Sequence, residues 1–169
     1  CPAAINDKPP ILGGSLGGEE ATGRGVFLTL SAAADDLGMA LSSSRAVVQG
    51  FGQVGSHLAS LLGETGCRIV AISDVYGGIF NADGIDISAL KEHVRNTGSV
   101  KDFSGTEPVA NDRIFAVECD IAVPAAVHDV IHSENAGEIK ARLIVEGANG
   151  PITDGADAIP NDKGGTIVP

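Results

Sequence analysis

The chain has 169 residues, and 11 lysines and arginines against 22 aspartates and glutamates give it a formal net charge of −11 at pH 7. A surplus of acid this large argues against a nucleic-acid partner, because phosphate backbones attract a basic face. No stretch approaches the ~18 uninterrupted apolar residues of a membrane span, and the N-terminus lacks a secretory signal pattern, so we expect no membrane partner and a cytoplasmic protein.

The first half of the chain alternates amphipathic segments with short β-branched runs. Apolar residues at three- and four-residue steps predict helices, and continuous apolar runs bounded by glycines predict strands. The expected elements are a helix at about 20–37, a strand at 45–49, a helix at about 54–62, a strand at 68–73, a small hairpin around 77–84 and a helix at about 87–94.

The second half repeats this alternation less regularly. It predicts strands at 120–123, 143–145 and 166–168 and a helix at 133–141. Strands that are apolar throughout and alternate with helices indicate a mostly parallel sheet covered on both faces, which is a doubly wound α/β fold. Because no linker or repeat interrupts the chain, we expect residues 1–169 to form one domain.

A glycine-rich motif lies between the strand at 45–49 and the helix that follows it. In such a GxGxxG motif the first glycine makes the turn, the second lets the backbone approach a pyrophosphate, and the third lets the helix pack on the strand. The helix N-terminus offers amide hydrogens to phosphates, which matters in an acidic chain. We therefore expect a Rossmann-type dinucleotide site whose loop residues are Gly50, Gly52, Gln53, Val54 and Gly55.

Asp74 follows the next predicted strand. A carboxylate at this place can accept both ribose hydroxyls of an adenosine. It would repel a 2′-phosphate and so favours NAD, but neither a second acid nor an arginine follows it, so we expect a modest preference with NADP as the alternative. A plainer interpretation stays open, in which the glycines only make a tight turn and Asp74 caps a loop.

Several segments carry longer motifs, at 13–17, 20–26, 49–55, 73–74, 77–79, 83–86, 119–126 and 146–151. In these segments the chain resembles glutamate dehydrogenases, within the family of glutamate, leucine, phenylalanine and valine dehydrogenases. The resemblance covers nearly the whole chain, and leucine and phenylalanine dehydrogenases fit the first and last motifs less well. It implies the C-terminal, NAD(P)-binding domain of such an enzyme.

The resemblance also implies roles for residues outside the glycine loop. Thr22 and Arg24 would lie by the cofactor, with Thr22 near the nicotinamide amide, although its hydroxyl could equally cap a helix start. Asn149 would lie near the nicotinamide ribose, and Ala125 and Ala126 would leave room for the cofactor beside a strand.

Four residues at three places depart from the family pattern. Gly18-Glu19 stands where the family usually has Arg-Asn, Gln53 where it commonly has Asn, and Ile152 where it has Thr. Gln53 can still donate an amide hydrogen to a phosphate, so we expect a weaker or shifted contact there.

The resemblance further implies a parent enzyme that oxidatively deaminates L-glutamate to 2-oxoglutarate and ammonia, with hydride transfer to NAD(P), and that assembles as a homohexamer. In the family an upstream domain holds the substrate and the catalytic lysines and aspartate. None of the five lysines here belongs to a glycine-rich substrate motif, so we expect no catalytic residue in this chain. The chain would be a fragment that lacks the substrate domain and the C-terminal helices; a stand-alone, non-catalytic NAD(P)-binding or sensing module is the alternative.

The remaining titratable residues suggest no metal site. The three cysteines form no CxxC pair, and His128 and His132 have no third ligand in sight, whereas zinc needs at least three protein ligands. Glu146 ends an apolar strand, and we expect it to make structural hydrogen bonds at the cleft floor rather than to contact the cofactor.

Overall fold

The computed structural model describes residues 18–158, 160 and 164–169, so the expected motif at 13–17 lies outside the described residues. The described residues form a seven-stranded sheet in the order β4-β3-β2-β1-β5-β6-β7. Its strands are β1 (Arg45–Gln49), β2 (Arg68–Asp74), β3 (Gly77–Phe80), β4 (Glu107–Val109), β5 (Ile121–Pro124), β6 (Leu143–Val145) and β7 (Thr166–Val168).

The sheet is mostly parallel, as the sequence predicts. β1 pairs in parallel with β2 and β5, and β6 joins β5 to β7 in parallel, while β3 pairs antiparallel with β2 and β4. The first strand, β1, therefore lies in the middle of the sheet. Strands β2, β3 and β4 extend the sheet on one side of β1, and β5, β6 and β7 extend it on the other. This doubly wound order opens a switch point at the carboxyl ends of β1 and β5, where open α/β sheets bind ligands.

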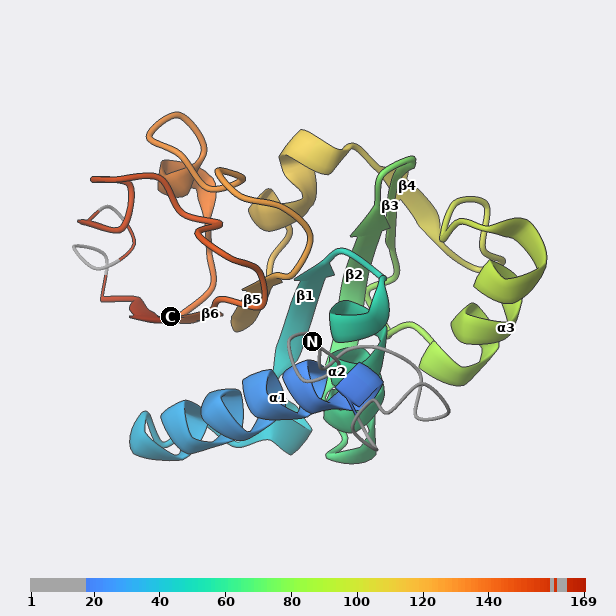
Figure 1. The fold of residues 1–169 in the computed structure, drawn as a ribbon, viewed down its shortest axis with the longest axis horizontal. Coiled ribbons are helices and arrows are strands. Elements are labelled where there is room, and N and C mark those ends of the chain that lie inside the picture. The colour runs from blue at the N-terminus through green and yellow to red at the C-terminus, as the bar shows by residue number, and fades with distance from the viewer. Residues whose placement is uncertain (1–17, 159, 161–163) are drawn as a thin grey trace, which may run out of the picture.

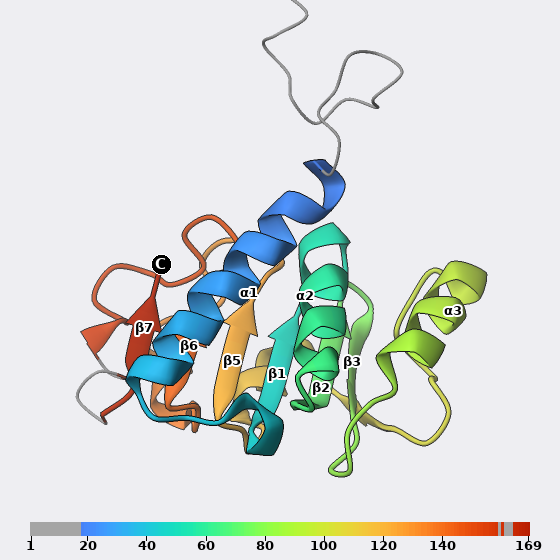
Figure 2. The same cartoon turned by 90° about the horizontal axis from the view of Figure 1, so that it is seen from below.

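Helices cover one face of this sheet (Figures 1 and 2). α1 (Gly18–Asp36), α2 (Gln53–Glu64) and α3 (Ile87–Thr97) bury apolar side chains such as Leu30, Leu58 and Leu90 against the strands. None of the described helices combines the length and the apolar character that a membrane crossing would require.

The opposite face is covered by loops and short 3-10 turns, η4 (Asn111–Ala116) and η5 (Ala136–Glu138), which pack Ile114, Phe115 and Ala136 on the sheet. A third 3-10 turn, η3 (Leu41–Ser43), leads into β1. Apolar side chains on both sides explain why the inner strands have no polar alternation.

α1 and α2 cross closely near their N-terminal ends. A Cβ atom on Gly23 would come within 3.0 Å of both the His57 Cβ and the Val54 carbonyl oxygen. The missing side chain lets the start of α1 approach the start of α2, at the end of the sheet to which the arrowheads of β1 and β5 point (Figure 2). α1 thus brings its first turns to the carboxyl-terminal end of the parallel strands.

Two predicted elements are wrong in detail. The first is the hairpin expected around 77–84. β3 instead pairs antiparallel with β2, through the turn at Val75-Tyr76, and with β4. The helix expected at 133–141 shrinks to η5, because Asn135 binds backbone groups instead: its Oδ1 accepts from the His132 amide at 2.8 Å, and its Nδ2 donates to the Val130 carbonyl at 2.8 Å. Such side-chain to backbone bonds compete with helix formation.

The sequence analysis also missed β4. This strand has three residues and contains Pro108, and it lies at the edge of the sheet. An edge strand tolerates proline because one side of it needs no ladder hydrogen bonds. A run this short with a central proline resembles a loop in sequence.

Candidate functional site

The ends of three strands are tied together at the switch point. The Gly50 amide donates to the Ser73 carbonyl at 2.8 Å, and the Ala125 amide donates to the Gln49 carbonyl at 2.8 Å. Gly50 has a φ of +96°, and a Cβ there would lie 2.8 Å from the Ala125 carbonyl oxygen. Only glycine suits this turn, since both the conformation and the close approach exclude a side chain.

The other two glycines of the loop differ in their surroundings. A Cβ on Gly55 would overlap the Gly50 carbonyl oxygen, so this position is closed by the packing of α2 on the end of β1. Gly52 is the N-cap of α2, with a φ of −77°, and a Cβ there would have no atom within 4 Å. Within the part of the chain that the structure describes, the missing side chain of Gly52 therefore serves no contact, and it leaves the backbone open.

A cavity of about 500 Å³ lies at this end of the sheet. It takes in five residues that the sequence analysis singled out: Gly50, Gly52, Asp74, Ala125 and Ala126. It also takes in Gln49, Phe51 and Ser73, which belong to the motifs at 49–55 and 73–74, and residues that no motif marked, namely Val75, Tyr76, Val94, Gly98, Asn111 and Val127.

The cavity has apolar walls and little side-chain charge. Val75, Tyr76 and Val127 are 83%, 67% and 56% exposed, which is unusual for side chains of this size. Asp74 is the only charged residue that lines the cavity among the described residues. α2 has neither a side-chain cap nor an acid in its first turn, so its N-terminal amides and dipole supply the positive potential here.

Two buried oxygens beside the cavity have no partner in the described part of the chain. They are Oε1 of Gln49 and Oγ of Ser73, which belong to register partners on the neighbouring strands β1 and β2. Buried polar atoms normally have a hydrogen-bond partner. Their position at the cavity is consistent with a polar ligand or ligand-bound water.

Asp74 anchors a loop in this structure. Its Oδ2 accepts hydrogen bonds from the Ser99 hydroxyl at 2.8 Å and the Val100 amide at 2.7 Å, and its Oδ1 accepts one from the Tyr76 amide at 2.8 Å. The carboxylate thus holds the segment after α3 against the end of β2, as in the plainer interpretation of the sequence. Oδ1 accepts one hydrogen bond from the described residues and so keeps an acceptor position.

Removing this carboxylate should destabilise the fold. We expect Asp74→Ala to lower the free energy of unfolding by about 2 kcal/mol, since three hydrogen bonds to a charged acceptor are lost. Chemical denaturation measures the change. Asp83→Ala is the matched control, because Asp83 is exposed and its carboxylate bonds no described residue, so a change of less than about 0.5 kcal/mol is expected. Equal losses in the two variants would contradict the anchoring role of Asp74.

The remaining predicted site residues are not among those that line the cavity. Gln53 is the first residue of α2 and is exposed, and Val54 follows it. Thr22 and Arg24 are on α1; Arg24 is exposed, and because α1 begins at Gly18, Thr22 lies one turn inside the helix and does not cap it. Asn149 is exposed in the loop after β6.

Glu146 follows β6 at the same end of the sheet. Burial raises the pKa of its carboxyl above the ordinary value. No described residue donates a hydrogen bond to this carboxylate, so the structure does not support the structural hydrogen bonds expected from the sequence. Among the described residues, no group of three histidines, cysteines or acids could hold a metal ion.

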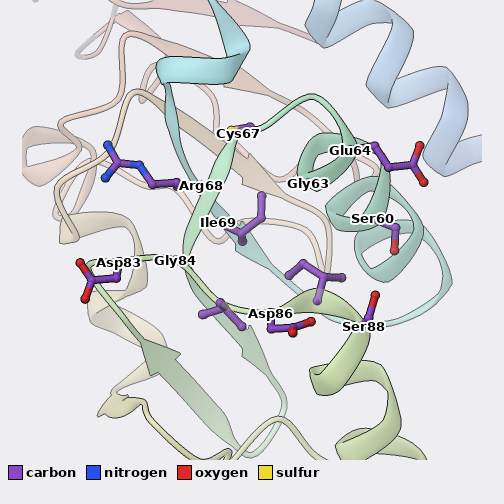
Figure 3. Close-up of a pocket in the computed structure, with 12 residues that line it drawn as sticks. Ser60, Gly63, Glu64, Cys67, Arg68, Ile69, Asp83, Gly84, Asp86 and Ser88 are labelled. Atoms are coloured by element: carbon purple, nitrogen blue, oxygen red, sulfur yellow. The ribbon is translucent and has the colours of Figure 1, made fainter.

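A second cavity, of about 480 Å³, lies at the opposite, amino end of β2 (Figure 3). Its wall combines Glu64 of α2, Arg68 of β2 and Asp86, whose carboxylate caps α3 by accepting from the Ala89 amide at 3.0 Å. Cys67 at its floor is no nucleophile, since burial and the charge of Asp120 raise the pKa of the thiol to about 12. This cavity has neither a glycine loop nor an open helix N-terminus.

Comparison with known proteins agrees with this geometry. The family model for glutamate/leucine/phenylalanine/valine dehydrogenase matches residues 13–169. The chain is 42% identical over 167 residues to the NADP-specific glutamate dehydrogenase of Saccharolobus shibatae, covering 99% of this chain and 40% of that protein.

Solved structures give the same result. The hetero-hexameric glutamate dehydrogenase from Thermus thermophilus superposes with a TM-score of 0.91 at 33% identity, over 99% of this chain and 39% of that one. Glutamate dehydrogenase from Peptoniphilus asaccharolyticus superposes with a TM-score of 0.76 at 30% identity, over 96% of this chain and 37% of that one. The chain thus spans about 40% of the length of its curated relative. Because the family model extends over all but the first residues, the chain belongs to the glutamate/leucine/phenylalanine/valine dehydrogenase family.

Proposed function

We propose that residues 1–169 act as the dinucleotide-binding domain of a glutamate dehydrogenase, with NAD or NADP as the cofactor. The observation that carries this proposal is Gly52. It lies at the uncapped N-terminus of α2, faces open space and borders the cavity at the switch point of the sheet. A backbone that is open at this place suits the close approach of a pyrophosphate.

The cavity fits the rest of a dinucleotide. The adenosine would lie beside Asp74, with the exposed apolar surfaces of Val75, Tyr76 and Val127 against the base. The partnerless oxygens of Gln49 and Ser73 face the same space. The nicotinamide half would extend across the end of β5, where Ala125 and Ala126 offer little bulk, toward Asn149 and the part of α1 that carries Thr22 and Arg24.

When bound, the dinucleotide would supply the hydride acceptor for oxidation of L-glutamate at its Cα atom, and water would then hydrolyse the resulting substrate imine to 2-oxoglutarate and ammonia. In this proposal the chain's own residues bind and orient the cofactor, and correct orientation is itself a large part of catalysis. The α2 amides would hold the pyrophosphate, and the alanines of the β5 loop would leave the nicotinamide accessible. Substrate binding and proton transfer would come from the substrate domain of a parent enzyme, which we propose is hexameric.

We also propose a cytoplasmic location. Cys67 and Cys119 are buried free thiols that precede strands β2 and β5. Burial raises the pKa of each thiol to about 12, so both stay protonated and unreactive. Unpaired cysteines fit a reducing compartment.

The expected result for the isolated chain is dinucleotide binding without turnover. Titrating the 169-residue chain into NADH and following the fluorescence of the nicotinamide should give saturable binding. Adding glutamate and NAD should give no reduction above background. Glutamate turnover by the chain would show that the catalytic groups are present here, and absence of NADH binding would refute the proposed function.

A further inference from the structure

The loop after β6 contains the pair Asn149-Gly150, which is the only asparagine-glycine pair in the sequence. Both residues are exposed and belong to neither a helix nor a strand. Asparagine is among the thermolabile residues of proteins, because its side-chain amide can be lost by reaction with the backbone of the next residue. Whether a given asparagine reacts depends on the freedom of both groups.

The backbone nitrogen of Gly150 is the nucleophile of this reaction, and it is free to react. The Gly150 amide donates no hydrogen bond to a described residue. Gly150 has no side chain to shield the nitrogen, and its φ of +57° lies in the left-handed region that glycine adopts without strain. The Asp83-Gly84 turn differs, because the Gly84 amide donates to the Asn81 carbonyl at 3.1 Å.

The side-chain amide of Asn149 is equally free, since it forms no hydrogen bond with a described residue. Asn81, Asn111 and Asn135 each donate a side-chain hydrogen bond to a backbone carbonyl, which holds the amide in place. None of these three residues precedes a glycine. Among the asparagines that the structure describes, Asn149 alone combines a free side chain with a following glycine.

The backbone is anchored on both sides of the pair. The Ala148 amide donates to the Pro124 carbonyl at 3.1 Å. On the other side, the Asp129 amide donates to the Gly150 carbonyl at 3.0 Å. Pro124 directly precedes Ala125, which lines the dinucleotide cavity. A longer chain between these two anchors would therefore have to move the loop beside the cavity.

We propose that Asn149-Gly150 is a site of spontaneous deamidation, which limits the lifetime of the adjoining cofactor site. The Gly150 nitrogen loses its proton to the solvent and attacks Cγ of Asn149, so that a new C–N bond closes a five-membered succinimide ring. The bond between Cγ and Nδ2 breaks, and ammonia leaves with a proton from the solvent. Water then opens the ring at either carbonyl and gives aspartate or isoaspartate. One water is consumed and one ammonia is released, so the step needs no oxidant or reductant.

Both products replace an amide, which donates hydrogen bonds, by a carboxylate, which only accepts them. Isoaspartate also inserts one more carbon atom into the backbone between the two anchors. The effect on the cofactor rests on the proposed function, in which the nicotinamide half extends toward Asn149, whereas the deamidation itself does not. We expect the deamidated chain to bind NADH at least about fivefold more weakly, which corresponds to the loss of one hydrogen bond.

Peptide mass spectrometry of the chain during storage at neutral and at mildly alkaline pH tests the chemistry. The tryptic peptide 143–163 should gain about 1 Da, with fragmentation locating the change at Asn149, and the rate should rise with pH because the deprotonated nitrogen attacks. Gly150→Ala should slow the gain at least about fivefold, since a methyl group shields the nitrogen. No described atom lies within 4 Å of that methyl group. Asn149→Gln should gain no mass at this position, because the same attack would have to close a six-membered ring.

Asn96 is the internal control. Its side chain also forms no hydrogen bond with a described residue, but Thr97 follows it within α3. The β-branched side chain of Thr97 and the helical backbone keep the next nitrogen away from the amide. Asn96 should therefore keep its mass. The deamidation site is refuted if Asn96 gains mass as fast as Asn149, or if Gly150→Ala leaves the rate at Asn149 unchanged.

NADH titrations of the fresh and the stored chain test the consequence for the cofactor. Asn149→Asp reproduces the new charge without lengthening the backbone, so it should bind NADH more weakly than the fresh chain and the isoaspartate form more weakly still. A fully deamidated chain that binds NADH as the fresh chain does would refute the effect on the cofactor site. If the fresh chain bound no NADH while Asn149 still gained mass, the proposed function would be refuted and the deamidation site would stand.

Discussion

Gly52→Val is expected to abolish dinucleotide binding while the fold persists. The backbone of Gly52 is extended, with φ −77° and ψ −159°, which valine adopts readily, and no atom within 4 Å would meet its Cβ. The new side chain would fill the space in which the backbone is proposed to meet the pyrophosphate. We expect affinity for NADH to fall by on the order of a hundredfold or more.

Gly63→Val is the matched control for this change. Gly63 lies near the end of α2, has no atom within 4 Å of where its Cβ would lie, and is far from the switch point. The control variant should bind NADH as the unmutated chain does, measured by the same fluorescence titration, with circular dichroism confirming both folds. If Gly52→Val bound NADH normally and only unfolded at a lower temperature, glycine would be needed at this position for packing and not for the pyrophosphate.

The largest effect on stability is expected from Gly55→Ala. A single methyl group at this position would overlap the Gly50 carbonyl oxygen, and Val48 Cγ1 lies only 3.4 Å from it. Neither neighbour can yield cheaply, because one is backbone in a constrained turn and the other is fully buried in β1. We expect a loss of at least about 3 kcal/mol in the free energy of unfolding, or failure to fold.

Gly63→Ala controls for the change in helix propensity. It makes the same substitution in the same helix without a steric conflict, and it should raise stability by up to about 1 kcal/mol. Thermal and urea unfolding of the two variants would give the comparison. A Gly55→Ala variant as stable as Gly63→Ala would contradict the close packing of α2 on β1.

The inner strands and the glycine loop could be predicted from sequence because local pattern and tertiary role coincide there. β1 and β6 have the expected bounds, since their apolar runs are buried inside the sheet, and the half-buried edge strand β7 has its expected bounds as well. Gly50 and Gly55 are required because a Cβ at either position would collide with backbone atoms. At these two positions the sequence motif and the packing of the fold both require glycine.

Other features depend on contacts that no local pattern records. Asp74 ends β2 as expected, but its hydrogen-bond partners Ser99 and Val100 lie in the loop that follows α3. The walls contributed by Gly98 and Asn111 likewise depend on how α3 and η4 pack, and Asn111 Nδ2 donates to the Asp74 carbonyl at 2.9 Å. The helix expected at 133–141 is only the short turn η5, because the Asn135 side chain forms hydrogen bonds with the backbone of His132 and Val130 in place of helical ones.

The most direct measurement for the central claim is a crystal structure of the chain with NADH bound. The account predicts pyrophosphate oxygens within hydrogen-bond distance of the α2 N-terminal amides, above Gly52, with the adenosine between Asp74 and Val127 at the carboxyl ends of β1, β2 and β5. A dinucleotide found instead in the cavity at the amino end of β2, beside Arg68 and Asp86, would contradict it (Figure 3).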